Sequence, residues 1–273
     1  MINKNIFDTV LNSKDIHERL KYLWSYQYRL SAEVLVPYLK KYKVFGKTMS
    51  VIEIGCGEGG VLTGFVEAGA EKALGTDIDE GRLNIGRKIA VKLKQNIDFL
   101  YHNITKDEPI EKWENKADLV LLRDVIEHLD NTELSLKNIK KFLKPGGFLF
   151  VTFPPYYTPF GGHQHILKTG WGKIPYIHFL PNFVFHRLIS SGHPYDIDEI
   201  KRLQSIRLTP KKFIRAAKEA GFTVIHNDFY LLRPVFKMKY GLPTIKLTGL
   251  SFIPFVKSFF SLEAAYILKN EIY

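Results

Sequence analysis

The chain has 273 residues, 45% hydrophobic and 25% charged, an ordinary globular composition with enough apolar residues to bury a substantial core. A net charge of +11 favours an anionic partner such as nucleic acid, a membrane surface or a phosphorylated substrate, unless it reflects only a basic surface. The single cysteine, Cys56, excludes an internal disulfide and a multi-cysteine zinc site, and it is typical of a reducing cytoplasm.

Neither end of the sequence indicates a membrane-spanning or secretory segment. The first residues lack the long apolar run of a secretory signal. The most apolar late stretch, residues 241–260, is interrupted by two prolines and two lysines, which argues against a transmembrane helix. We therefore expect a cytoplasmic protein, while peripheral contact with a membrane stays open.

In chain order, the first predicted unit is an N-terminal helical cap over residues 1–46. Leu20, Leu23 and Leu30 lie near helical spacing within residues 13–42. Five strands follow, alternating with helices, at residues 50–54, 72–77, 97–101, 117–122 and 148–153. The helix after the fourth strand should begin near Asp130, with Glu133 placed as in a capping box. This alternation predicts an α/β fold with a doubly wound, mostly parallel sheet.

The regular pattern lapses after Phe153 and resumes in a helix that begins at Thr209-Pro210 and ends at Gly221. Two late strands, at residues 222–232 and 264–269, have no helix of crossover length clearly between them. We expect them to form an antiparallel pair that closes a seven-stranded sheet. The main domain would then cover residues 47–273, with insertions at 154–208, after the fifth strand, and at 233–262.

A glycine-dense turn follows the first strand. Glycine accepts positive φ and lets backbone approach a ligand closely, and the first amides of the next helix are unpaired. These features favour an adenosine-type cofactor. Gly55, Gly57 and Gly60 satisfy the dinucleotide fingerprint G-x-G-x-x-G, whereas Glu53, Gly55, Gly57 and Gly59 satisfy the E-x-G-x-G-x-G pattern of S-adenosylmethionine (SAM) enzymes. The turn alone does not decide between them.

Other features favour SAM. Asp77, about twenty residues past the glycines, can accept both ribose hydroxyls in either kind of site. Glu53, the Pro145-Gly146-Gly147 run and the late strand pair belong to the methyltransferase pattern. The chain thus resembles class I SAM-dependent methyltransferases, particularly the ubiquinone-type O-methyltransferases. The resemblance covers residues 44–153 well, and residues 209–232 and the last strand less tightly.

The resemblance implies a set of SAM-binding residues. Glu53, Gly55, Gly57 and Gly59, in the turn that also holds Cys56, would line the methionine side, and Arg123 and Asp124 would border the same moiety. Asp77 would hold the ribose, and Ile78 would lie against the adenine. Asn103, followed by Ile104, stands where the family more often has an aspartate that faces the adenine amine. Asparagine can accept that hydrogen bond through its carbonyl oxygen.

The acceptor would lie above the carboxyl ends of the strands, under the insertion 154–208. His163 or His165 is the candidate general base for a hydroxyl acceptor, and either could instead be an ordinary loop histidine. Aromatic residues at 176–186 could wall an apolar or sugar-bearing pocket or form a small core of their own. The late run 250–255 could extend that wall or contact a membrane.

A divalent metal is a second hypothesis for the chemistry. The resemblance extends to metal-dependent O-methyltransferases of the ubiquinone and small-RNA 2′-O types, which carry an E-x-x-E-H run at this place. Asp124, Glu127 and His128 give D-x-x-E-H here. His165 or His163 would be the later ligand of Mg²⁺ or Mn²⁺, which would lower the pKa of the acceptor hydroxyl. A Glu-His-Leu run is also frequent in metal-free relatives, so a metal-free site stays open.

The leading prediction is a SAM-dependent methyltransferase that modifies a hydroxyl of a small molecule: a glycan precursor, a polyketide-like compound or an isoprenoid. One alternative is an RNA 2′-O-methyltransferase with a divalent metal, which the net charge supports and the lack of a recognisable RNA-binding module weakens. Another is a non-catalytic SAM-binding protein, and a nicotinamide dehydrogenase is more distant. The oligomeric state stays open.

Overall fold

A computed structural model describes residues 2–248 and 254–271, except for the side chains of residues 254 and 255. The apolar run 250–255, a candidate pocket wall or membrane contact, therefore falls outside the described side chains. Within the described ranges, no helix is both long and apolar enough to cross a membrane.

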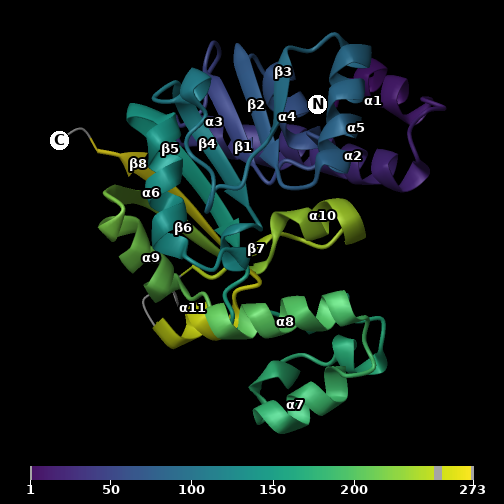
Figure 1. The fold of residues 1–273 in the computed structure, drawn as a ribbon, viewed down its shortest axis with the longest axis vertical. Coiled ribbons are helices and arrows are strands. Elements are labelled where there is room, and N and C mark those ends of the chain that lie inside the picture. The colour runs from purple at the N-terminus through teal and green to yellow at the C-terminus, as the bar shows by residue number, and fades with distance from the viewer. Residues whose placement is uncertain (1, 249–253, 272–273) are drawn as a thin grey trace.

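The described residues contain one eight-stranded sheet in the order β3-β2-β1-β4-β5-β8-β6-β7 (Figure 1). Strands β1 to β5 pair in parallel, and β8 lies antiparallel between β5 and β6. The doubly wound, mostly parallel α/β fold with an antiparallel last strand is thus confirmed. The strands are β1 Ser50–Ile54, β2 Lys72–Asp77, β3 Ile97–Tyr101, β4 Ala117–Arg123, β5 Leu143–Phe153, β6 Phe222–Leu232, β7 Ile245–Lys246 and β8 Glu263–Asn270.

The sheet differs from the prediction in two places. The eighth strand, β7, was not expected; it is two residues long and pairs with the end of β6, inside the predicted insertion 233–262. Strand β5 begins five residues before the predicted start because Leu143 pairs with Ala117 ahead of a register shift. The shift coincides with Gly146, whose φ is 78°, so the Pro-Gly-Gly run bends the strand instead of preceding it.

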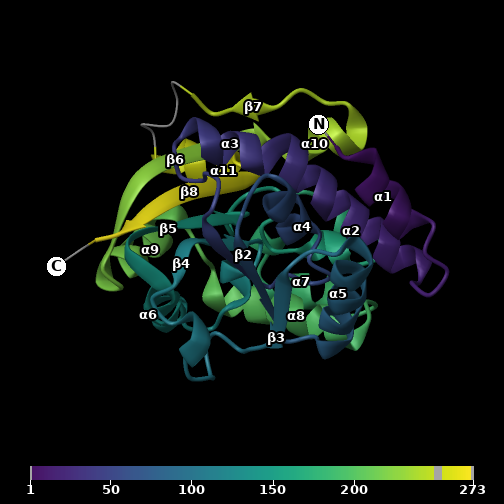
Figure 2. The same ribbon diagram turned by 90° about the horizontal axis from the view of Figure 1, so that it is seen from above.

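Helices cover both faces of the sheet, as Figure 2 shows. Helices α6 and α9 pack on one face and α2 to α5 on the other. Each face has its own core because successive strand side chains point to opposite sides: Ile52 lies in one core, and Val51 in the other. The helices are α1 Lys4–Leu11, α2 Glu18–Leu30, α3 Val36–Lys41, α4 Gly60–Glu67, α5 Glu80–Leu93, α6 Thr132–Phe142, α7 Asn182–Ile189, α8 Pro194–Ile206, α9 Pro210–Glu219, α10 Pro234–Tyr240 and α11 Pro254–Phe260.

Residues 1–46, the expected N-terminal cap, contain helices α1, α2 and α3. Helix α1 lies outside residues 13–42 and is capped by Asn3, whose side chain accepts a hydrogen bond from the Asn5 amide. A π-helical turn, Ser31–Leu35, connects α2 to α3. The start of α6 is also shifted: its N-cap is Asn131, whose Oδ1 accepts from the Leu134 amide at 2.9 Å, so the predicted capping box at Asp130 was wrong.

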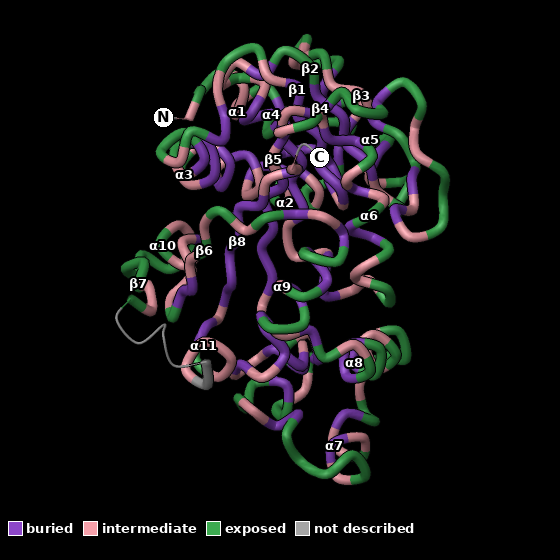
Figure 3. The backbone as a smooth tube through the Cα atoms, turned by 90° about the vertical axis from the view of Figure 1, so that its left-hand side faces the viewer, coloured by how far each residue is buried: buried purple, intermediate pink, exposed green. Residues whose placement is uncertain are grey.

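The insertion 154–208 forms helices α7 and α8, which lie beyond the sheet in Figure 1. They are held by a small core of their own: Leu167, Ile177, Phe185, Ile189 and Ile200. Figure 3 shows buried residues concentrated in the sheet and more exposed residues along α7 and α8. The aromatic residues at 176–186 are therefore divided between core and surface: Phe185 is fully buried in this core, while Phe183 is 79% exposed.

Candidate active site

The glycine turn connects β1 to α4 and is tied to β2. Gly55, Gly57 and Gly59 all have positive φ, between 55° and 74°, which non-glycine residues adopt only with strain. The amides of Gly55 and Cys56 both donate to the Thr76 carbonyl, at 2.7 and 3.0 Å. A side chain at Gly55 would lie 2.5 Å from a methyl of Val125, so the turn needs glycine for space as well.

Asp77 is fixed at the carboxyl end of β2. Its Oδ2 accepts from the Gly57 amide at 2.8 Å, and its Oδ1 accepts from the Asp79 amide at 3.0 Å. Next to it, Arg82 forms a two-point ion pair with the buried Glu58, at 2.8 and 2.7 Å. The carboxylate of Asp77 is therefore held in place by backbone, with a fixed guanidinium group nearby.

A cavity of about 560 Å³ lies along these carboxyl ends. Several of the predicted SAM-binding residues line it: Glu53, Gly55, Asp77, Ile78, Asn103, Ile104, Arg123 and Asp124. Gly57 and Gly59 are instead covered by the side chains of Arg82 and Phe99, which occupy the space a Cβ would need. The side chain of Cys56 is buried in the core on the α4 face. We call this space the cofactor cavity.

Other residues of the cofactor cavity had no motif to reveal them. Tyr26 and Gln27 come from α2, Arg82 from α5, and Tyr195, Glu199 and Arg202 from α8. All of them except Arg82 lie far from the glycine turn in sequence and approach it only in the folded chain. Arg82 follows Asp77 by five residues, so its position just after the second strand could have indicated a place in the site.

Two polar side chains of the cofactor cavity, Glu53 and Asn103, bear on how a cofactor could bind. Burial raises the pKa of Glu53 to about 8, although the Arg123 charge opposes the shift. Its Oε2 accepts no hydrogen bond from any described residue. Asn103 Oδ1 accepts from both the amide and the hydroxyl of Thr105, at 3.1 and 2.7 Å. Contact of that oxygen with an adenine amine would therefore require the side chain to turn.

A second cavity, of about 540 Å³, adjoins the first. The two share Tyr26, Asp124 and His128 in their walls. The insertion 154–208 contributes Pro154, Thr158, Phe160, His163 and His165, and the segment 233–262 contributes Arg233, Val235, Phe236, Lys239, Tyr240 and Leu262. Both predicted insertions therefore wall this space, which we call the acceptor cavity.

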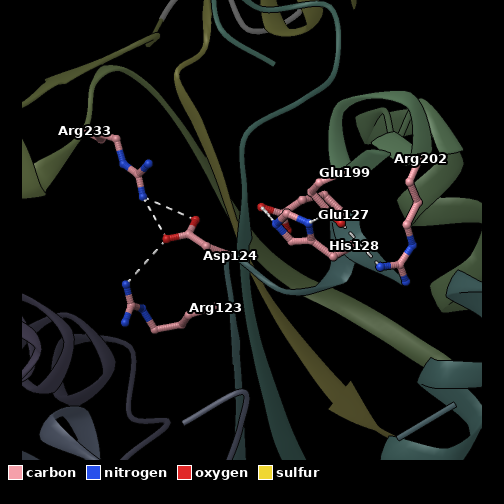
Figure 4. Close-up of polar contacts among 7 residues, drawn as sticks. All are labelled: Arg123, Asp124, Glu127, His128, Glu199, Arg202 and Arg233. Carbon is pink, nitrogen blue, oxygen red and sulfur yellow. Dashed lines mark hydrogen bonds and ion pairs between the residues drawn. The ribbon is translucent and has the colours of Figure 1, made fainter. Parts of the chain in front are cut away.

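Three of the predicted metal ligands meet at the acceptor cavity. Donor atoms of Glu127, His128 and His163 all lie within 4.8 Å of one another. Asp124 and His165 are not in this group. Asp124 pairs instead with Arg233 at 3.0 Å and with Arg123 at 3.7 Å (Figure 4). The ring centroid of His165 lies 5.5 Å from that of His163. The structure thus brings together Glu127, His128 and the alternative later ligand, His163.

The backbone after β4 explains this separation. Asp124 has a φ of 51°, and its amide donates to the Thr152 carbonyl of β5 at 2.8 Å. The chain turns sharply there into a short 3₁₀ helix, Ile126–His128, anchored by the fully buried Ile126. Asp124 therefore faces α10, whereas Glu127 and His128 face the insertion.

The pKa values of the three clustered side chains, Glu127, His128 and His163, are all shifted. Burial raises the pKa of Glu127 to about 8. Burial, together with the charge of His128, lowers the pKa of His163 to about 3, so this ring is neutral. Burial would also lower the pKa of His128, but its contact with Glu199 and the charges of Glu127 and Glu199 raise it. A neutral imidazole beside a buried carboxyl is a donor set suited to a cation.

Comparison with known proteins places the chain. The model of a family described as a methyltransferase domain matches residues 23–227. The chain belongs to this methyltransferase family. Among curated relatives, the ubiquinone biosynthesis O-methyltransferase of Rhizobium etli is 33% identical over 103 residues, covering 38% of this chain and 40% of that protein. The mitochondrial enzyme of the same name from Dictyostelium discoideum is 29% identical over 133 residues, covering 44% and 41%.

The chain thus spans less than half the length of either relative. Among solved structures, geranyl diphosphate C-methyltransferase from Streptomyces coelicolor superposes with a TM-score of 0.59 at 12% identity, covering 96% of this chain and 86% of that one. That likeness is one of fold. Together, these matches confirm the resemblance to class I SAM-dependent methyltransferases.

Proposed function

We propose that this methyltransferase moves a methyl group from SAM to a hydroxyl of a small molecule. The observation that carries the proposal is the shared wall between the two cavities, of about 560 and 540 Å³. Residues Tyr26, Asp124 and His128 border both, so two bound molecules can meet there. Holding two reactants at such a boundary supplies much of the rate of a displacement reaction.

In this proposal the cofactor cavity binds SAM. Asp77, already fixed by two backbone amides, accepts hydrogen bonds from the ribose hydroxyls, and Glu53 faces the methionine amine. Ile78, which is 64% exposed, covers the adenine. Bound SAM would supply an electrophilic methyl group on a sulfonium. The acceptor oxygen would attack that methyl carbon in line, so that S-adenosylhomocysteine leaves as a neutral thioether and the hydroxyl proton passes to a base.

We further propose that Glu127, His128 and His163 bind a divalent cation. Neither oxygen of Glu127 accepts a hydrogen bond from a described residue, although the side chain is 96% buried, and buried polar groups without a partner are costly. The Nε2 of His128 lies 3.8 Å from Glu127, while its Nδ1 is taken by Glu199. A bound Mg²⁺ or Mn²⁺ would lower the pKa of a nearby acceptor hydroxyl.

His165 is then the proposed general base. Its ring lies in the wall of the acceptor cavity, and burial lowers its pKa, so it is neutral and able to accept a proton. With His163 assigned to the cation, the two candidate histidines take different roles. Removing His165 should slow turnover roughly 10²- to 10⁴-fold without removing the cation.

The walls of the acceptor cavity favour an apolar acceptor. Phe160, Phe236 and Tyr240 line it, and Lys239 lies 4.3 Å from the ring centroid of Tyr26. A polyketide-like or isoprenoid compound would meet the aromatic walls, and the lysine would meet an anionic substituent. A glycan precursor with an apolar carrier also fits this combination.

A labelled-methyl assay tests the proposal. The protein is incubated with methyl-labelled SAM and cell extract separated into small-molecule and RNA fractions, with and without EDTA. We expect label in the small-molecule fraction, lost with EDTA and restored by Mg²⁺. Asp77→Ala should abolish labelling, whereas Asp98→Ala, which removes an exposed carboxylate paired with Lys112, should not.

Each alternative predicts a different outcome. Label confined to RNA would favour the RNA methyltransferase and contradict the small-molecule acceptor. SAM binding without label in any fraction would favour the non-catalytic alternative. Labelling that EDTA does not reduce would contradict the cation alone.

A further inference from the structure

Helix α8 of the insertion reaches the carboxyl end of β4 with two charged side chains. Glu199 contacts Nδ1 of His128 (Figure 4). Arg202 donates a hydrogen bond to Asp130 at 2.8 Å. Arg202 also lies 3.6 Å from the second oxygen of Glu199. The Glu199 side chain is only 19% exposed, so this contact is largely shielded from water. It is therefore a stronger interaction than a surface ion pair.

The contact determines which nitrogen of His128 is free. A carboxylate at Nδ1 keeps a proton on that nitrogen, so Nε2 carries the available lone pair. Nε2 is the atom that lies 3.8 Å from Glu127 Oε1. In metal sites, a carboxylate on the far nitrogen orients the ligand imidazole and raises its basicity, and its loss typically weakens metal binding.

We propose that Glu199 is a positioning residue for His128 and that it makes cation binding depend on the docking of α8. The proposal rests on the cation site of the proposed function. The same insertion supplies two elements of that site: His163 as a ligand and Glu199 as the partner of a ligand. If α8 moves away, His128 loses its orientation.

This arrangement couples the cation to the acceptor. The insertion that carries α8 also walls the acceptor cavity through Phe160 and His165. An acceptor bound beneath the insertion favours its docked position, and a docked α8 favours the cation. Because linkage is reciprocal, the cation and the acceptor should each raise the affinity for the other. The enzyme would then complete its cation site when an acceptor is in place.

The test measures Mn²⁺ binding by electron paramagnetic resonance, with S-adenosylhomocysteine present and no acceptor. We expect Glu199→Ala to raise the Mn²⁺ dissociation constant roughly 10- to 100-fold. Glu199→Gln can still accept a hydrogen bond, so its Mn²⁺ dissociation constant should lie between those of the wild type and Glu199→Ala. Glu219→Ala is the matched control, since it removes a carboxylate paired with the exposed Arg215 on α9; its Mn²⁺ affinity should be that of the wild type.

A second readout needs neither metal nor activity. In metal-free protein, at a pH high enough for the His128 ring to be neutral, ¹⁵N chemical shifts of that ring should show the proton on Nδ1 in the wild type and a mixture of tautomers in Glu199→Ala. Equal Mn²⁺ affinity and an unchanged ring in Glu199→Ala would overturn the role of Glu199 and leave the proposed function standing. Wild-type protein that binds no Mn²⁺ would instead contradict the cation of the proposed function itself.

Discussion

At the scale of single residues, Asp124 forms ion pairs with two arginines and does not join the cluster of possible metal ligands. Its carboxylate lies between Arg123 and Arg233, and Arg233 also pairs with Glu263 at 2.7 Å. Burial opposes ionisation of Asp124, but the two arginines lower its pKa, so the group stays charged. Its charge is thus already balanced by guanidinium groups. Of the D-x-x-E-H run, Glu127 and His128 belong to the cluster of possible ligands, and its third member is His163 in place of Asp124.

The titration of Glu53 gives a prediction on stability. Burial raises the pKa of Glu53 from 4.5 to about 8. The charges of Arg123 and Arg82 oppose this rise, and the charge of Asp77 adds to it. Between these values the folded protein keeps a proton that the unfolded chain releases. The free energy of unfolding should therefore fall as pH rises from about 4.5 to 8, by at most about 1.4 kcal/mol per pH unit from this group.

The measurement is urea unfolding at several pH values without SAM. Glu53→Gln should have a flatter profile than the wild type across this window. Glu133→Gln is the control, since it removes an exposed carboxylate paired with Lys137. Parallel profiles for the wild type and Glu53→Gln would show that Glu53 is ionised in the folded protein.

The glycine turn and Asp77 were marked by their spacing from strand ends, and the Glu127-His128 pair by the resemblance to the family. The structure places Gly55, Asp77 and His128 in the wall of the cofactor cavity. Their partners were not predictable in the same way. Glu199 follows His128 by 71 residues, and Arg233 follows Asp124 by 109. Such contacts depend on how insertions fold back over the sheet, and a single sequence contains no periodic signal for that.

At the scale of elements, the start of α6 illustrates how two adjacent capping residues compete. Asp130 and Asn131 are both favourable N-cap types. Asn131 caps the helix, while Asp130 instead accepts from Arg202 of α8. The long-range ion pair and the cap are thus satisfied together when the helix begins one residue later than predicted.

Substitution separates these two roles. Asn131→Ala should lower the free energy of unfolding by about 1 kcal/mol, the usual cost of losing an N-cap side chain. Asp130→Ala removes only an exposed ion pair and should cost less than about 0.5 kcal/mol. Urea unfolding of both variants checks this, and a larger loss for Asp130→Ala would restore the predicted cap.

The elements that were missed are short or depend on distant partners. Strand β7 has two residues and exists because β6 offers an edge for pairing. Helix α8 had a local signal, a proline at its first turn after His193, whose ring nitrogen accepts from the Tyr195 amide. That signal lay within a segment of turns and was not used.

At the scale of the whole molecule, the parallel sheet collects the functional groups at one edge. Strands β1, β2 and β4 end at the cofactor cavity, and the two insertions close the acceptor cavity beside it. The alternation of strands and helices was sufficient to predict the sheet, and the two cavities lie at the carboxyl ends of its strands, where parallel α/β sheets commonly bind ligands. How the two insertions fold over the sheet could not be predicted from the sequence.

The most direct test of the account is a crystal structure with S-adenosylhomocysteine and Mn²⁺, with anomalous diffraction to locate the manganese. We expect the ribose on the Asp77 carboxylate, the sulfur directed toward the wall shared by Tyr26 and His128, and manganese bonded to Glu127, His128 Nε2 and His163. S-adenosylhomocysteine outside the cofactor cavity, or manganese bound at other residues, would contradict the account.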